Sequence, residues 1–312
     1  MTAIAITAQV QDYLSLRRAM GFDLRGEGYQ LHAFARFLGE QEEAGDLTLE
    51  LLLRWVHGAI SPGPVTAARR VEVLRPFLKY CRQFDPDCPA IPLGFCDSGH
   101  RRLSPHIYTD AEVKALLVAA AELKPDGLRP LTFMTLFGLL AATGMRLAEA
   151  LRLERKDLNL DKPSLTVRAT KFKKSRLVPI HFSTANALAS YQKATAAALR
   201  RPNVETVFLT TEGRSLPNRT IHHTFDHIRR RLGWVARGGH PLPRIHDLRH
   251  TFICNALLRG QQDNRIDHVV DAISTYVGHV KVSDTYWYIS ATPELMSGAS
   301  QRFSCFSSGG SR

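Results

Sequence analysis

The feature that most constrains the fold is the repeat of hydrophobic residues along the chain and the place where that repeat stops. Residues 1 to about 85 contain four stretches with apolar residues at helical spacing, separated by turn residues. The segment DPDCPAIPLGFCDSGHRRLSP that follows is rich in proline and glycine and keeps no period, as expected of a linker. We therefore predict two domains, over residues 1–98 and 105–312, and the first of these is a small helical bundle.

Secondary structure is predicted from the same periodicity. In the first domain we expect helices at about 6–20, 26–40, 47–59 and 64–82. The second domain begins with a capping box, Thr109 to Glu112, ahead of helices at about 110–122 and 128–142. The period then changes to two in SLTVRAT and SRLVPI, which indicate short strands, and TVFLT allows a third. Further helices are expected at about 183–199, 218–233, 246–259, 266–277 and 292–303. The predicted fold class is mainly α with a small β-sheet.

The charge of the chain favours a polyanionic partner. The 312 residues include 41 Lys and Arg against 29 Asp and Glu, a net charge of +12, and most of the basic residues are arginines. A guanidinium binds a phosphate through two parallel hydrogen bonds, whereas an ammonium acts as a point charge. Nucleic acid is therefore the first expectation, and a basic protein without such a partner is the alternative.

The cysteine pattern and the apolar runs exclude several classes of protein. Five cysteines without CxxC spacing do not indicate a disulfide framework or a structural zinc site. The first residues, MTAIAITAQV, lack the basic start of a signal peptide, and the longest apolar run, at about 131–142, is too short to cross a bilayer. We expect a cytoplasmic protein without a membrane segment.

Four fragments carry residue types suited to phosphate chemistry. In RIHDLRHTF, His246 and Arg249 stand three positions apart, so on a helix they project from one face. That spacing also arises by chance in a chain with this many histidines and arginines. ATGMRLAEALRL places Arg146 after a Thr-Gly break, TKFKKSRLVPI is a basic hairpin, and VGHVKVSDTYWY ends in two tyrosines.

Taken in their order along the chain, the fragments resemble the tyrosine recombinase (phage integrase) family. Its motifs read approximately TGxRxxE, a hairpin lysine before RxVPL, HxLRH, and LGH with a tyrosine nine residues further on. The resemblance covers about 105–303, and the first domain resembles, more loosely, the family's helical core-DNA-binding (SAM-like) domain. The second domain would then be the α+β catalytic domain.

The resemblance implies a site-specific DNA recombinase of the integrase or transposase type. Such an enzyme cleaves and rejoins strands of a double-stranded recombination site through a covalent 3′-phosphotyrosyl intermediate, without metal, ATP or a small-molecule cofactor. It acts as a homo-tetramer on DNA, and here PELMSGASQRF would be the oligomerisation segment. The alternatives are a catalytically inactive DNA-binding accessory protein and a topoisomerase IB-like enzyme that relaxes and reseals one strand alone.

The resemblance also implies a role for each motif residue. Arg146 and Arg249 would hold the scissile phosphate, His279 would donate a further hydrogen bond, and His246 would accept the proton of the nucleophile. The hairpin lysine that protonates the departing 5′-oxygen aligns with Lys171, although a register shifted by two residues stays open. Glu149 would orient Arg146.

Two tyrosines compete for the role of nucleophile. Tyr288 lies nine residues after His279, at the family's spacing, and Tyr286 lies seven after it. On a helix the two phenols would point about 200° apart, so only one of them can reach a given phosphorus. We predict Tyr288 as the nucleophile and Tyr286 as a packing residue. His250 is expected to face away from His246 and to serve the structure.

Other basic residues are predicted to contact DNA without taking part in the chemistry. They are Lys173, Lys174, Arg176, Arg229 and Arg230. For Arg229 and Arg230, a helix face that is simply exposed to solvent explains the basic residues equally well. His222, His223 and His227 suggest a metal site, but no carboxylate or cysteine completes one at a suitable spacing, so we predict none.

Overall fold

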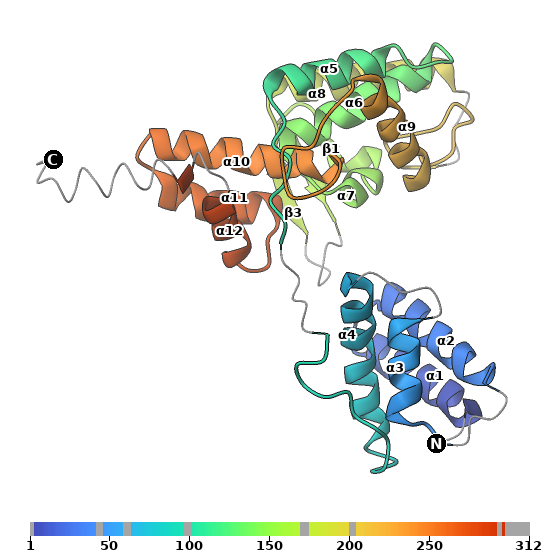
Figure 1. Cartoon of the computed structure of the whole chain (residues 1–312). Coiled ribbons are helices and arrows are strands. Elements are labelled where there is room, and N and C mark those ends of the chain that lie inside the picture. The colour runs from blue at the N-terminus through green and yellow to red at the C-terminus, as the bar shows by residue number, and fades with distance from the viewer. Residues whose placement is uncertain are drawn as a thin grey trace, which may run out of the picture. The chain divides into compact units, whose positions relative to one another are not determined.

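The computed structural model describes residues 3–41, 46–58, 64–96, 102–168, 175–199, 204–291 and 295–296. Within it the chain divides into two compact units, Met1–Arg102 and Leu103–Arg312 (Figure 1). Each unit has its own apolar core. The predicted linker falls at this division.

The first unit consists of helices around an aromatic core. They are α1 (Ala3–Ala19), α2 (Arg25–Gly39), α3 (Leu49–His57) and α4 (Pro64–Cys81), all within a few residues of their predicted bounds. α4 packs against each of the other three. Phe34 and Trp55 meet edge to face with ring centroids 5.2 Å apart, and the fully buried Phe77 meets Tyr13 at 5.7 Å. Burial of each such side chain stabilises the unit by about 1.5–3 kcal/mol.

The second unit combines helices with a small sheet. Its helices are α5 (Asp110–Ala121), α6 (Leu128–Thr143), α7 (Leu147–Leu151), η1 (Arg155–Asp157), α8 (Phe182–Ala198), α9 (Asn218–Arg231), α10 (His246–Gln262), α11 (Ile266–Val277) and α12 (Ser283–Ala291). The predicted capping box is present at the start of α5: the Thr109 hydroxyl accepts from the Glu112 backbone N–H, and the Glu112 carboxylate accepts from the Thr109 backbone N–H. The fold-class prediction, mainly α with a small sheet, is confirmed.

The sheet differs in part from the prediction. β1 (Leu158–Asn159), β2 (Ser164–Val167) and β3 (Arg176–Pro179) form an antiparallel sheet in that order, with Leu165 opposite Val178. The prediction that TVFLT forms a third strand of this sheet is wrong, because the third strand is β1. The TVFLT backbone bonds to two different partners, from Val207 to the carbonyl of Leu153 and from Leu216 to that of Phe208. Only isolated bridges result, rather than a ladder.

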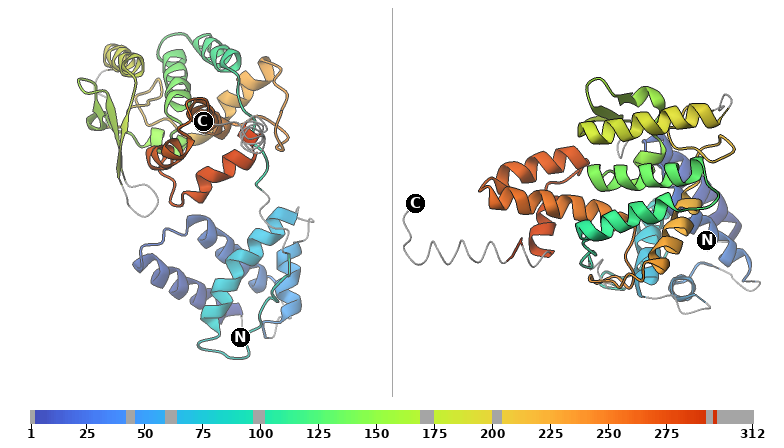
Figure 2. Two further views of the ribbon diagram at one scale, coloured as in Figure 1. Left: turned by 90° about the vertical axis from the view of Figure 1, so that its left-hand side faces the viewer. Right: turned by 90° about the horizontal axis from the view of Figure 1, so that it is seen from above.

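Helix α10 connects the core of the second unit to its C-terminal part. It packs against α6 on one side and against α11 and α12 on the other, and the views in Figure 2 show α11 and α12 beside it. This arrangement brings the segments that carry Arg146, Arg249 and Tyr288 toward one region of the unit. Among the described helices, none combines the length and apolar composition that crossing a lipid bilayer requires.

Candidate active site

Arg146 is placed by a sharp turn at the end of α6. Gly144 ends the helix with φ of 59°, a left-handed conformation that favours glycine. Arg146 is then the N-cap residue of α7. A Cβ at Gly144 would come within 2.5 Å of the Phe252 ring, so the turn also needs glycine for space. The Thr-Gly break in the sequence is therefore what directs Arg146 out of α6.

The Arg146 guanidinium is held at both of its terminal nitrogens. Nη1 donates to Glu149 Oε1 at 2.9 Å, and Nη2 donates to the carbonyl oxygen of Gly278 at 3.2 Å. Glu149 Oε2 also accepts from the backbone N–H of Arg146 at 2.9 Å. Glu149 thus orients Arg146, in the arrangement that the motif predicted.

Arg249 lies in the first turn of α10 and is almost completely buried, at 3% exposure. Its Nη1 donates to the carbonyl of Gly144 at 2.8 Å, and its Nη2 donates to that of Val277 at 2.9 Å. Burial, together with the nearby charge of Arg146, lowers the pKa of Arg249 to about 10. The guanidinium is therefore still charged at neutral pH, fixed between the ends of α6 and α11.

Both arginines open on one pocket of about 270 Å³. It is lined by Leu140, Met145, Arg146, Leu147, Ala148, Asn218, His222, Ile245, His246 and Arg249. Two fixed guanidiniums and an imidazole on one small cavity can neutralise an oxyanion such as a phosphodiester. Asn218 and His222 come from the first turns of α9. Sequence reasoning missed Asn218 and considered His222 only as a metal ligand, because no local spacing connects α9 with the other motifs.

His246 contributes a neutral imidazole to this pocket. The protein atoms around the ring displace part of its water, and the guanidiniums of Arg249 and Arg244 oppose a further positive charge, which lowers the pKa of His246 to about 4. One side of the residue still faces solvent. At neutral pH the ring is therefore uncharged, with one nitrogen that can accept a hydrogen bond and one that can donate it.

The predicted nucleophile lies beside the pocket rather than in its wall. Tyr288 is 4% exposed and packs in an apolar cluster with Ile253 and Val277, whereas Tyr286 is 49% exposed. The two tyrosines therefore point to different sides of α12, as predicted. Tyr288 is not among the residues that line the pocket of Arg146 and Arg249, but its hydroxyl lies near enough to Arg249 for their charges to interact.

His250, and not His246, makes the hydrogen bond to Tyr288. The His250 Nδ1 and the Tyr288 hydroxyl lie 2.7 Å apart. The expectation that His250 faces away from His246 is wrong, because residues four apart share a helix face, and the two rings meet edge to face at 4.7 Å. Burial, followed by the charges around it, lowers the pKa of His250 to about 2, so this ring is neutral.

His279 follows the turn that ends α11. Gly278 caps this helix with φ of 69°, and the next ring bonds through Nδ1 to the Thr285 hydroxyl at 2.7 Å. The ring lies nearly parallel to that of Tyr288, with centroids 6.3 Å apart. Thr285, which is fully buried, therefore holds the His279 ring parallel to that of Tyr288.

The residues predicted to contact DNA are placed differently from one another. Lys171, Lys173 and Lys174 lie outside the described residues. Two of the arginines predicted to contact DNA make contacts within the protein instead. Arg176 directs its guanidinium to Glu149 with 13% of the side chain exposed, and Arg229, at 12%, is occupied by Asp226 and the carbonyl of Pro243. Arg230 is exposed, and for it a DNA contact stays a prediction.

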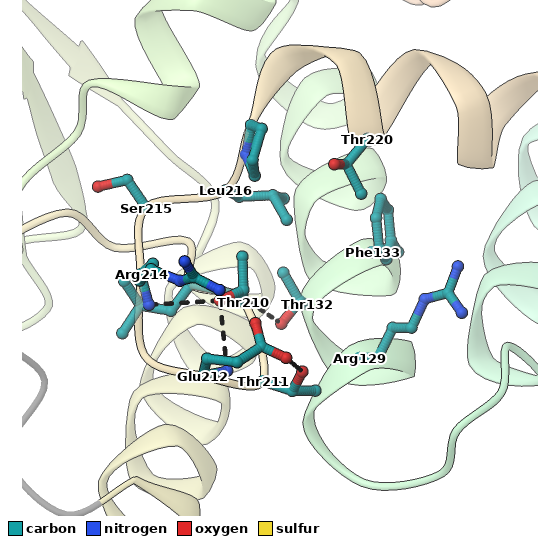
Figure 3. A pocket seen from close by; sticks show the side chains of 12 residues that line it. Arg129, Thr132, Phe133, Thr210, Thr211, Glu212, Arg214, Ser215, Leu216 and Thr220 are labelled. Carbon is teal, nitrogen blue, oxygen red and sulfur yellow. Dashed lines mark hydrogen bonds between the residues drawn. The ribbon is translucent and has the colours of Figure 1, made fainter.

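A larger pocket, of about 470 Å³, lies elsewhere in the second unit (Figure 3). Arg129, Thr132 and Phe133 of α6 face a loop that carries Thr210, Thr211, Glu212 and Arg214, and Thr220 of α9 stands beside them. None of the motif residues lines it. Its buried hydroxyl, on Thr132, already has the carbonyl of Leu128 and the hydroxyl of Tyr191 as partners. Size therefore does not identify the site here, and chemistry favours the smaller pocket.

Comparison with known proteins gives the same relationship over most of the chain. Residues 107–294 match the model of the phage integrase family. The chain is 37% identical over 301 residues to y4rB, a predicted integrase/recombinase of Sinorhizobium fredii strain NGR234, which spans 94% of this chain and 95% of that protein. It is 31% identical over 192 residues to the tyrosine recombinase XerC of Lactobacillus leichmannii, covering 61% of this chain and 59% of that one.

Solved structures share the fold at low sequence identity. XerH site-specific recombinase, in a post-cleavage complex with a palindromic difH substrate, superposes with a TM-score of 0.65 at 17% identity, over 89% of this chain and 79% of that one. The Tn1549 transposon integrase in complex with transposon right end DNA gives 0.65 at 16% identity, over 97% and 100%. With a family model that matches more than half of the sequence and a relative aligned along nearly all of it, this chain belongs to the phage integrase family.

Proposed function

We propose that this protein is a site-specific DNA recombinase that breaks and rejoins DNA strands through a covalent bond to Tyr288. The observation that carries the proposal is the common pocket of Arg146 and Arg249. The two residues come from different helices, and backbone carbonyls at the ends of α6 and α11 hold their guanidiniums. Such a fixed pair of cations is what phosphoryl transfer requires, because negative charge grows on the non-bridging oxygens.

The reaction is a pair of transesterifications at one phosphorus. The Tyr288 oxygen forms a bond to phosphorus while the bond from phosphorus to the 5′-oxygen breaks, which leaves a 3′-phosphotyrosyl ester and a free 5′-hydroxyl. Attack by the 5′-hydroxyl of a partner strand reverses these bonds and releases the tyrosine. The number of ester bonds is unchanged, so the sequence of steps needs no external source of energy.

Two proton transfers accompany each transesterification. An ordinary phenol has a pKa of about 10, so the Tyr288 proton needs an acceptor. His246 takes it in this proposal, since its neutral ring lines the pocket beside the phenol. Lys171 protonates the departing 5′-oxygen, and His279 adds a hydrogen bond to the phosphate. In the resting state His250 retains the phenol within the apolar cluster.

DNA is the partner that the charge and the relatives support. The net charge of +12 provides for phosphate contacts whose strength falls with salt. The similar XerH and Tn1549 proteins are described in complexes with DNA. We assign the first unit to core DNA binding, and we propose a homo-tetramer on DNA as the form that exchanges strands.

A suicide-substrate experiment tests the proposal. Duplexes carrying sequences that copurify with the protein are nicked near the cleavage point, so that the short 5′-hydroxyl fragment diffuses away and the covalent complex accumulates. Wild type and Tyr286→Phe should form the complex, and Tyr288→Phe should bind the same DNA without forming it. Tyr286→Phe is the matched control because it removes a hydroxyl from the same helix.

The possible outcomes separate the alternatives. A covalent complex with Tyr288→Phe would show that another residue is the nucleophile. Binding of the duplex without any adduct in wild type would identify an inactive DNA-binding protein. Relaxation of supercoiled plasmid without four-way junction products would identify a topoisomerase-like enzyme.

A further inference from the structure

We propose that Arg176 is a positioning residue for Arg146, which acts through Glu149 and couples the β2–β3 hairpin to the arginine pair of the pocket. The inference rests on the proposed function and deepens it. It replaces the prediction that Arg176 contacts DNA, because its side chain is turned into the protein with 13% exposed. No motif described above assigns this residue a part in catalysis.

The first observation is a carboxylate shared by two guanidiniums. Glu149 Oε1 accepts from Arg146 Nη1 at 2.9 Å and from Arg176 Nη1 at 3.0 Å. Oε2 accepts from the backbone N–H of Arg146 at 2.9 Å and from Arg176 Nη2 at 2.8 Å. Each oxygen thus has one partner from each arginine. Arg176 thus binds the Glu149 carboxylate in a bidentate manner, through both of its terminal nitrogens.

The second observation is the contact of the same guanidinium with the end of α11. Arg176 Nε donates to the carbonyl oxygen of Tyr276 at 2.9 Å. Two residues further on, the carbonyl of Gly278 accepts from Arg146 Nη2, and a Cβ on Gly278 would meet Arg176 Nη1 at 2.8 Å. Arg176 therefore uses Nε, Nη1 and Nη2 at once, on two segments that both also contact Arg146.

These contacts explain how Glu149 obtains enough donors while Arg146 still lines the pocket. Glu149 is 3% exposed, and a buried carboxylate needs several donors, because a buried charge without partners is costly. Burial by itself would raise the pKa of Glu149, but the hydrogen bonds from Arg176 and from the Arg146 backbone outweigh burial and hold the pKa at about 2. With Arg176 in place, Arg146 supplies only Nη1 and its backbone N–H to the ionised carboxylate. Without it, the Arg146 guanidinium would turn toward Glu149.

The position of Arg176 in the sequence gives this contact a second consequence. Arg176 is the first residue of β3, paired with Val167 of β2, and Lys171 precedes it by five positions (176 − 171). A side chain anchored to Glu149 and to the α11 end fixes where the hairpin leaves the sheet. Arg176 thereby ties the strand that follows Lys171 to the residue that binds the phosphate.

The test compares Arg176→Gln and Arg176→Lys with Arg168→Gln. Arg168 is a matched control, since it follows β2 at the base of the same hairpin and pairs with a buried carboxylate, Asp157, that does not touch Arg146. The readouts are the single-turnover rate of covalent-complex formation at saturating suicide duplex, the Kd for that duplex, and the melting temperature. A double-mutant cycle with Arg146→Lys measures the coupling between the two arginines.

We expect Arg176→Gln to slow covalent-complex formation on the order of 10- to 100-fold, as is typical when the residue behind a ligating group is lost. Arg176→Lys should recover part of the rate, Arg168→Gln should keep the wild-type rate, and the Kd for DNA should change little in all three. The effects of Arg146→Lys and Arg176→Gln should not add. Additive effects, or a rate loss that follows the melting temperature in both Arg176→Gln and Arg168→Gln, would overturn the proposal.

A measurement without cleavage keeps this inference separate from the proposed function. In protein labelled with ¹⁵N-arginine, inorganic phosphate should shift the Nε–Hε signal of Arg146. In Arg176→Gln that signal should start from a different position and respond only at about 10-fold higher phosphate. If wild type forms no covalent complex but these shifts appear, the recombinase proposal fails and the positioning role stands. If the signal is the same in wild type and Arg176→Gln, the positioning role is wrong.

Discussion

The arginine pair and the tyrosine helix of this site are held in opposite ways. Arg146 and Arg249 are fixed by hydrogen bonds to Glu149 and to backbone carbonyls at the ends of α6 and α11. Tyr288 lies on a helix of nine residues, in apolar packing, with a hydrogen bond to a neutral His250. In the proposed mechanism, the groups that stabilise charge are therefore fixed in advance, whereas the group that attacks is buried in apolar packing beside them.

A physical reason underlies this division. Fixed donors stabilise a transition state without reorganisation at the moment of reaction, so rigidity is useful in the clamp formed by Arg146 and Arg249. A nucleophile that stood permanently in the pocket could react whenever an ester entered. Apolar packing has no strict direction and can be exchanged for other apolar contacts, so in the proposed mechanism it can release Tyr288 when DNA binds.

The largest expected effect is on the clamp. Arg249→Gln should lower the rate of covalent-complex formation by about 100- to 1,000-fold, or about 3–4 kcal/mol, because one fixed donor to the phosphate is lost. The control is Arg259→Gln, which removes an exposed arginine from the same helix and should keep the wild-type rate. A loss below 10-fold would mean that the pocket does not hold the scissile phosphate. The measurement is the single-turnover rate on suicide duplex.

The next largest effect is expected for a substitution at Gly144, in the turn that places Arg146. Gly144→Ala places a Cβ at φ of 59° and 2.5 Å from the Phe252 ring, which should lower the free energy of unfolding by about 2–3 kcal/mol. The matched change is Gly138→Ala in the interior of α6, where the Cβ would lie 3.8 Å from Leu117. It should be neutral or stabilising by up to about 1 kcal/mol. Urea unfolding compares the two, and equal effects would refute the role of the turn.

Amide hydrogen exchange tests directly whether the helix that carries Tyr288 is held less rigidly than the helix that carries Arg249. Amides of α12 near Tyr288 should exchange on the order of 10-fold faster than those in the middle of α10, because a nine-residue helix opens more readily than a seventeen-residue helix that packs against α6, α11 and α12. Equal protection in free protein would show that the nucleophile is as rigidly held as the clamp. Addition of cognate DNA should change the exchange of α12 more than that of α10.

The smallest expected effect is a pH dependence from His250. Its folded-state pKa of about 2 lies below the unfolded value of about 6.5, so the unfolded chain binds the proton more tightly. The stability linked to this histidine is complete above about pH 6.5 and is lost as the pH falls toward the folded pKa. Between pH 6 and 5, wild type should lose about 1 kcal/mol from this group, and His250→Gln should remove that part of the slope. Urea unfolding at these pH values checks it, and an unchanged slope in the variant would contradict the assigned environment of His250.

Much of the fold and of the pocket could be predicted from local patterns. The helical period, the capping box at Thr109 and the Thr-Gly break before Arg146 act within one or two turns of chain, so they are visible in the sequence. The contacts of Arg176 and Arg229 could not be predicted, since an arginine that faces DNA and one that faces a buried carboxylate look alike in sequence. The TVFLT segment was misassigned because its period is that of a strand, while the neighbouring backbone it could pair with is set by packing.

The sequence by itself determined which residue types stand at which helical positions, and with them the order of the motifs and the placing of Tyr286 and Tyr288 on different sides of one helix. The tertiary structure decided that Glu149 is shared between Arg146 and Arg176, that Arg249 binds the ends of two other helices, and that Tyr288 rests against His250. Local spacing fixes only the direction in which a side chain leaves its own helix. What that side chain meets depends on how segments distant in the sequence pack together.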